Sequence, residues 1–248
     1  MRSGNPTLNA ETFVPYESTA TAATNVMTVQ GAATKTLILL GLCVGSASFT
    51  WSMVLATPQA AMPWIMGGAI GGFVLAIITS FYPRGASITG PLYAHAEGLF
   101  LGGLTAIINA QYPGIAMQAV GLTFGTMFAL LMAYQTGLIK ATENFKLGVF
   151  AATGGIALLY MASMVLGFFS IRMPFIHEAG IIGIGFSAFV VIIAALNLVL
   201  DFDFIEQAAA RGTPKYMEWY AAFGLMVTLV WLYVEILRLL SKLRSNER

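Results

Sequence analysis

The sequence has little charge. Only 9% of its 248 residues are Asp, Glu, Lys or Arg, whereas 58% are hydrophobic and the mean hydropathy is +0.79. A soluble globular chain carries about 25% charged residues, so this composition excludes a soluble domain and indicates a polytopic membrane protein. The net charge of +1 gives no sign of nucleic-acid binding, and the single cysteine, Cys43, excludes an internal disulfide framework.

The N-terminal segment lacks the apolar stretch of a secretory signal, and Arg2 follows Met1 where N-myristoylation would require Gly. We interpret residues 1–34 as a polar, partly disordered tail and residues 35–248 as the membrane domain. The first hydrophobic helix is then expected to direct insertion.

Apolar runs of the length that crosses a bilayer, about 20 residues, recur along the rest of the chain. They cover residues 37–57, 61–81, 89–109, 113–135, 147–169, 179–201 and 217–240. Because lipid tolerates only helices or closed barrels, and these runs are too long for barrel strands, the sequence predicts an all-α bundle of seven transmembrane helices.

Small residues recur at four-residue spacing in two of these runs. GGAIGG (67–72) pairs Gly67 with Gly71 and Gly68 with Gly72, and Ala94, Gly98 and Gly102 form a second stripe. Such stripes let helix backbones approach closely, so we expect tight helix packing here.

The distribution of basic residues favours a cytoplasmic N-terminus. With the N-terminus inside, the outer loops hold only Arg172, as the positive-inside rule requires. Seven spans place the C-terminal tail outside, although it carries Arg238, Lys242, Arg244 and Arg248.

Ionisable side chains inside spans are costly and usually mark ion pathways or proton relays. Five residues stand out: Glu97 in the third run, Asp201 and Asp203 at the end of the sixth, Glu235 in the seventh, and Arg84 at the mouth between the second and third.

Each acid also has a purely structural interpretation. Asp201 and Asp203 would be hydrated and ionised if they lie in the headgroup layer. Glu97 would join neighbouring helices by a hydrogen bond. Glu235 would pair with Arg238 three residues later. His95 is more typical of a packing residue than of a metal ligand, since no second His lies at a ligand spacing.

The register of the last two helices decides whether Asp201 and Glu235 meet. AAARG (208–212) predicts a helix that continues to Gly212, and Pro214 suits the first turn of the next helix. In a simple hairpin the residue opposite Asp201 falls near 225, and Glu235 lies about 15 Å too deep. If residues 216–223 instead lie in the interface and the buried helix begins near Gly224, the two acids come level.

Three segments carry a resemblance to a known family: ITGPLYAHAEGLFLGG (88–103), LDFDFIEQAAARGTPKY (200–216) and LYVEILRLL (232–240). In order and content they resemble the transmembrane Bax inhibitor motif family, in particular its bacterial branch. The resemblance covers most of the chain, from NPTL (5–8) to the last helix.

The resemblance implies six helices around a central last helix, a bacterial inner membrane location, and a pH-sensitive calcium leak. It also implies a hydrogen-bonded pair of acids that senses pH, for which Asp201 matches the first position and Glu235 the second. The sequence departs from the pattern, because the second acid is Glu rather than Asp, the segment between the acids is longer, and Asp203 is additional. Arg84 is the candidate for the family's basic latch.

Two close carboxylates in a low-dielectric bundle share a proton, and its loss would part the last two helices. Calcium favours several oxygen ligands, which Asp201, Glu235, Asp203 and Glu97 could supply; no resident cofactor is expected.

The alternatives to a calcium leak are a scaffold that binds other membrane proteins and a proton-coupled carrier. An enzyme is not expected, because GIIGIGF (180–186) lacks the acid of an intramembrane aspartyl protease.

Overall fold

The computed structural model describes residues 25–169 and 180–246. Within these ranges the helices are α2 (Val29–Ala56), α3 (Pro58–Phe81), α4 (Ala86–Gln111), α5 (Ile115–Gln135), α6 (Glu143–Phe168), α8 (Ile181–Ala210) and α9 (Met217–Asn246), with the 3-10 turn η2 (Pro83–Gly85) between α3 and α4. Each predicted run corresponds to one helix, so the all-α prediction is confirmed. Arg172 and the tail up to residue 24 lie outside the described residues.

Local signals explain where the helices begin and end. The Thr28 hydroxyl accepts a hydrogen bond from the Gly31 amide at 2.9 Å and caps α2. Residues 29–34 are therefore helical, and the predicted boundary of the tail at residue 34 is wrong for this stretch. Pro58 occupies the first turn of α3, and Gly212, with φ of 69°, follows the end of α8.

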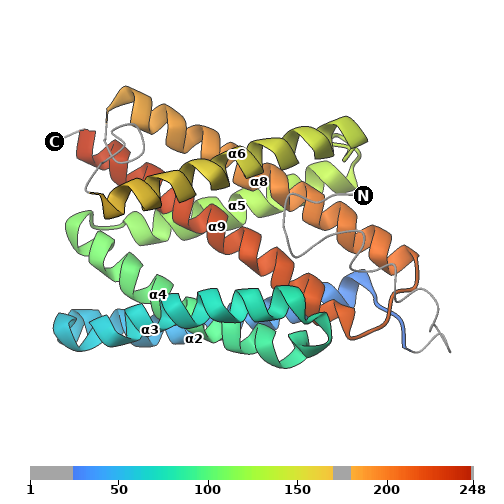
Figure 1. The fold of residues 1–248 in the computed structure, drawn as a ribbon, viewed down its shortest axis with the longest axis horizontal. Coiled ribbons are helices and arrows are strands. Elements are labelled where there is room, and N and C mark those ends of the chain that lie inside the picture. Colours follow the sequence, from blue (N-terminus) through green and yellow to red (C-terminus); the bar gives the residue numbers. More distant parts are fainter. Residues whose placement is uncertain (1–24, 170–179, 247–248) are drawn as a thin grey trace.

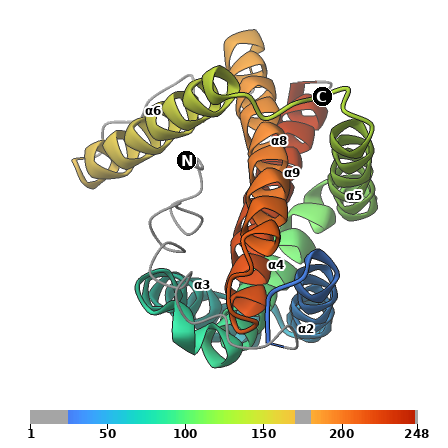
Figure 2. The same ribbon diagram turned by 90° about the vertical axis from the view of Figure 1, so that its right-hand side faces the viewer.

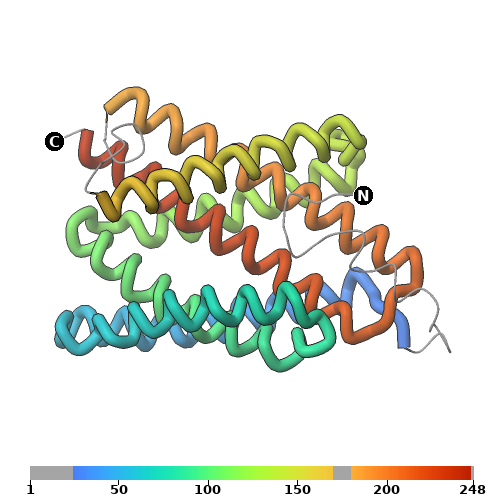
Figure 3. Tube along the Cα trace, in the orientation of Figure 1, coloured from blue at the N-terminus to red at the C-terminus, as the bar shows by residue number. Residues whose placement is uncertain are grey.

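The last helix lies at the centre of the molecule. In Figure 1, α9 runs diagonally between a group formed by α2, α3 and α4 and the helices α5, α6 and α8, and the trace in Figure 3 follows the same course. α9 contacts α8, α2, α4 and α5. α6 contacts α8, and its C-terminal part swings away from α8 and α9 (Figure 2). The prediction of a central last helix is confirmed.

Glycines bring α4 close to its two neighbours. A Cβ atom on Gly98 would overlap the Cys43 carbonyl oxygen of α2, and one on Gly68 of α3 would lie 2.6 Å from the Ala96 carbonyl oxygen. Gly67, in contrast, faces open space. The stripe of Gly68 and Gly72 therefore packs tightly on α4, whereas the stripe of Gly67 and Gly71 reaches α4 only at Gly71, at ordinary contact distance.

Six of the described helices are long and apolar enough to cross a membrane. The seventh, α4, is not among them, although it has the length of a span. It packs on both α2 and α3, which shelter its polar side chains. The lower hydropathy of α4 thus accompanies a position inside the bundle.

Candidate functional site

The interface between α8 and α9 holds the two acids singled out in the sequence, at different depths. The turn at 211–216 joins the helices, and farther along Lys242 Nζ donates to Ser187 Oγ at 2.8 Å. These two points place residues near 226 level with Asp201. Glu235 lies about nine residues farther along α9, roughly 13 Å at 1.5 Å per residue.

The direct pairing of Asp201 with Glu235 is therefore not present in this structure. The register that would have brought them level required residues 216–223 to lie outside the buried helix. Instead, α9 begins at Met217, and Met217, Tyr220 and Phe223 are fully buried. The simple hairpin holds in this structure, so the two acids lie at separate levels. The role of these acids in sensing pH stays a prediction.

Asp201 lies in the core of the bundle. Its exposed fraction is 0%, and its α8 neighbours Leu198 and Ile205, one turn away on either side, are also buried. The interpretation of Asp201 as a wet headgroup residue is wrong. An acid this deeply buried is held in a place where ionisation has a high cost unless a partner or water accompanies it.

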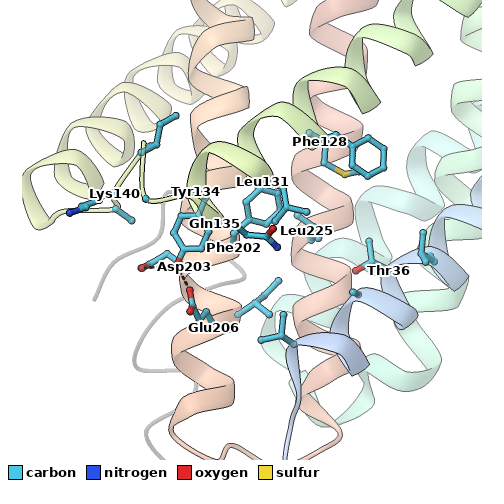
Figure 4. A pocket seen from close by; sticks show the side chains of 18 of the residues that line it. Thr36, Phe128, Leu131, Tyr134, Gln135, Lys140, Phe202, Asp203, Glu206 and Leu225 are labelled. Carbon is cyan, nitrogen blue, oxygen red and sulfur yellow. Dashed lines mark hydrogen bonds between the residues drawn. The ribbon is translucent and has the colours of Figure 1, made fainter.

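Asp203 and Glu206 lie on another side of α8 and face α5 and α6. The Tyr134 hydroxyl donates to Glu206 and, at 3.4 Å, to Asp203 Oδ1, while Lys146 Nζ lies 2.9 Å from Asp203 Oδ2. Gln207 donates to the same oxygen of Asp203 at 2.6 Å. Figure 4 shows Tyr134, Asp203 and Glu206 together at one end of a cavity. This polar cluster joins the end of α5 and the start of α6 to α8.

Glu235 is the centre of a second polar cluster, toward the C-terminal end of α9. Arg238 donates to its two oxygens at 2.9 and 3.1 Å, and the Tyr160 hydroxyl of α6 donates to them at 3.0 and 3.1 Å. Arg238 also lies 2.6 Å from the Tyr160 hydroxyl. The pairing of Glu235 with Arg238, one of the two interpretations of this residue, is thus confirmed. Tyr160, which the sequence analysis did not identify, completes the cluster from α6.

Glu97 and His95 connect α4 to its neighbours. Glu97 lies against Gly72 of α3, where a Cβ atom would lie 3.0 Å from Glu97 Oε1. His95 Nδ1 lies 2.8 Å from Ser46 Oγ of α2, and Ser46 donates its own hydroxyl proton to the Leu42 carbonyl. Nδ1 of His95 is therefore the donor in that pair. His95 packs between helices, as its structural interpretation expected. Glu97 packs against Gly72 of α3, and its expected hydrogen bond to a neighbouring helix stays a prediction.

Arg84 lies in η2, is exposed, and sits beside α9 at the end of the bundle where α8 meets α9. Its assignment as a latch stays a prediction. Lys146 contacts Asp203, Arg238 contacts Glu235, and Lys35 holds another acid, the buried Glu218. Sequence reasoning missed the Lys146–Asp203 and Lys35–Glu218 pairs because each joins residues far apart in the chain, whereas the Glu235–Arg238 pair was predicted from its three-residue spacing.

Metal ligands are sparse. Among residues 25–169 and 180–246, no three His, Cys, Asp or Glu side chains are grouped so as to hold a metal ion.

A family comparison agrees with this architecture. The model of the family described as Bax inhibitor 1 like matches residues 5–245. The chain belongs to this family. No curated protein and no solved structure matches the chain. Together with the six apolar helices, family membership makes this an integral membrane protein.

The acids on α8 and α9 lie within the region that matches the Bax inhibitor 1 like family. The matched region includes the seven described helices, except the last residue of α9, and every acid discussed above. In this member, the two acids on α8 and α9 occupy separate levels of one interface, each in its own surroundings. Any mechanism for this chain has to begin from that separation.

Proposed function

We propose that this protein is a pH-sensitive calcium leak in which the α8–α9 interface is the gate. The observation that carries the proposal is the complete burial of Asp201 in that interface, in a member of a family of membrane channels and transporters. Buried ionisable residues in membrane helices mark ion or proton pathways more often than they serve packing.

The proton on Asp201 is the switch in this proposal. When Asp201 is protonated, the neutral acid is compatible with the dry interface around Leu198 and Ile205. When it loses the proton, a negative charge forms inside the buried interface, where ionisation is costly, and this favours a hydrated, open interface. Raising the pH therefore opens the leak, and lowering it closes the leak.

The other acids have different tasks in the proposal. Glu206 lies near the end of α8, where its carboxylate attracts cations toward the interface, whereas Asp203 is paired with Lys146. Glu235 is already balanced by Arg238 and Tyr160, so it holds α6 to α9 rather than carrying the pH response. Calcium is the transported ion and not a resident cofactor.

Calcium efflux from liposomes that contain only the purified protein tests the proposal. Wild type is expected to release calcium faster at pH 8 than at pH 6. Asp201→Asn removes the switch, so its efflux at pH 8 is expected to fall about fivefold or more, the low end of typical coupling free energies, and to lose its pH dependence.

Glu143→Gln is the matched control. Glu143 is 78% exposed at the start of α6, so this substitution removes one carboxylate that lies outside the interface. It should keep the wild-type pH dependence. Liposomes that stay tight at every pH would instead favour a scaffold that binds other membrane proteins, and saturable efflux that follows a proton gradient would indicate a carrier.

A further inference from the structure

A cavity of about 840 Å³ lies between α2 and α5, with α8 and α9 behind it. This volume lies within the range of about 300–1,000 Å³ that is typical of small-molecule sites, which are mostly apolar with a few polar groups. Leu37 of α2 and Phe128 of α5 line the cavity and are 69% and 58% exposed. Both belong to apolar helices that are long enough to cross the membrane, so the cavity opens sideways toward lipid.

The polar groups of the cavity gather at one end. Tyr134, Asp203 and Glu206 lie there, on the side of the cavity opposite Phe128 (Figure 4). α5 ends at Gln135, so this end lies where the helix leaves the apolar layer, and the exposed Lys140 of the following loop also lines the cavity. The cavity is therefore apolar along the membrane and polar at its boundary, as a phospholipid is.

The charged groups at the polar end differ in whether they can accept further hydrogen bonds. Asp203 is balanced by Lys146 at 2.9 Å and by Gln207 at 2.6 Å. Glu206 is exposed and receives the Tyr134 hydroxyl proton, which leaves its carboxylate with capacity to accept further hydrogen bonds. Lys140 supplies a positive charge at the same boundary. One anion and one cation at the mouth of an apolar cavity complement a zwitterionic headgroup.

We propose that this cavity binds a phospholipid with a primary-amine headgroup, of the phosphatidylethanolamine class. The ammonium donates to Glu206, the phosphate lies toward Lys140, and an acyl chain lies between Leu37 and Phe128. A choline headgroup has no N–H to donate to Glu206, and a glycerol headgroup has no positive charge. Selection therefore rests on charge-assisted hydrogen bonds to Glu206.

Native mass spectrometry of the purified full-length protein tests this. Phosphatidylethanolamine, phosphatidylcholine and phosphatidylglycerol with identical acyl chains are titrated separately. Wild type is expected to retain phosphatidylethanolamine about tenfold more tightly than the other two, the factor for one hydrogen bond to a charged group. Glu206→Gln should remove this preference, and Glu143→Gln, which alters an exposed acid outside the cavity, should keep it.

A second pair of variants locates the lipid. Ala33→Trp places a large ring in the cavity and should lower retention of all three lipids, whereas Thr34→Trp, at the exposed neighbouring position outside the lining, should not. Equal retention of the three lipids by wild type, a preference that survives Glu206→Gln, a preference for phosphatidylglycerol, or full retention by Ala33→Trp would each overturn the proposal. Gel filtration of every variant establishes that it is folded, and the Glu206→Gln comparison stands alone if Ala33→Trp does not fold.

Discussion

At the scale of single residues, the buried Glu218 is held by partners from the start of another helix. Glu218, at the start of α9, is 1% exposed and accepts hydrogen bonds from the Thr28 amide and hydroxyl, both at 3.0 Å, and from Lys35. Lys35 in turn lies 5.6 Å from the centre of the Trp219 ring. One carboxylate thus fixes the start of α2 to the start of the central helix.

Glu218→Ala should destabilise the protein, because it leaves Lys35 and the Thr28 amide without their shared acceptor. We expect a loss of about 2–3 kcal/mol in the free energy of unfolding, measured by denaturant titration in detergent micelles. Glu143→Ala, which removes an exposed acid from an ion pair with Lys146, should change it by less than about 0.5 kcal/mol. Equal losses for the two variants would show that the Glu218 contacts do not contribute to stability.

The sequence alone identifies the buried acids but not most of their partners. Asp201, Glu235 and Glu97 were identifiable because charge is rare in apolar runs. Their partners were not, since nothing in the sequence connects Tyr160 with Glu235 or Lys146 with Asp203 before the helices are packed. The exception is Arg238, whose spacing of three residues from Glu235 on one helix is visible in the sequence.

At the scale of helices, α2 and α4 are joined by backbone contact at glycine. Cβ atoms on Gly98 and Gly102 would overlap the carbonyl oxygens of Cys43 and Ala47. These atoms belong to a helix backbone and cannot move aside as a flexible side chain would. The pair of helices depends on the absence of these two methyl groups.

Gly98→Ala is therefore expected to cost about 1–3 kcal/mol by overpacking. Gly45→Ala is the matched control, because a Cβ atom there meets nothing within 4 Å, and it should leave stability unchanged or raise it by up to about 1 kcal/mol through helix propensity. Thermal unfolding in detergent compares the two variants. A tolerated Gly98→Ala would contradict the close approach of α2 and α4.

Helix positions followed from the sequence, whereas the register of α8 and α9 did not. Apolar length located each helix, and Gly212 marked the end of α8, whereas α3 begins at Pro58, three residues before the predicted run that starts at residue 61. Tyr216 to Phe223, in contrast, has the Tyr, Trp and Glu composition of a membrane interface, and yet most of it is buried. Lys35 and Thr28 neutralise Glu218 there, and these long-range contacts, absent from any local pattern, allow α9 to begin at Met217.

At the scale of the whole molecule, charge is unevenly distributed between the two ends of the bundle. The end where α8 meets α9 carries most of the described basic residues, namely Lys35, Arg84, Lys140, Lys146, Arg211 and Lys215, while the opposite end carries Arg238, Lys242 and Arg244, all on α9. By the positive-inside rule the first end is cytoplasmic, and that orientation stays a prediction. Asp201 then lies toward the cytoplasmic side of the gate and Glu235 toward the other side.

The central claim is that Asp201 and Glu235 act separately across one interface. Calcium efflux from liposomes between pH 6 and 8 tests it with Asp201→Asn, Glu235→Gln and the double variant. Sites this far apart should give additive effects on the logarithm of the efflux rate, within about 0.5 kcal/mol. Asp201→Asn should flatten the pH dependence, Glu235→Gln should change the rate while retaining it, and the double variant should combine the two effects. If either substitution alone flattens the pH dependence and the second adds nothing, the two acids share one proton and the account is contradicted.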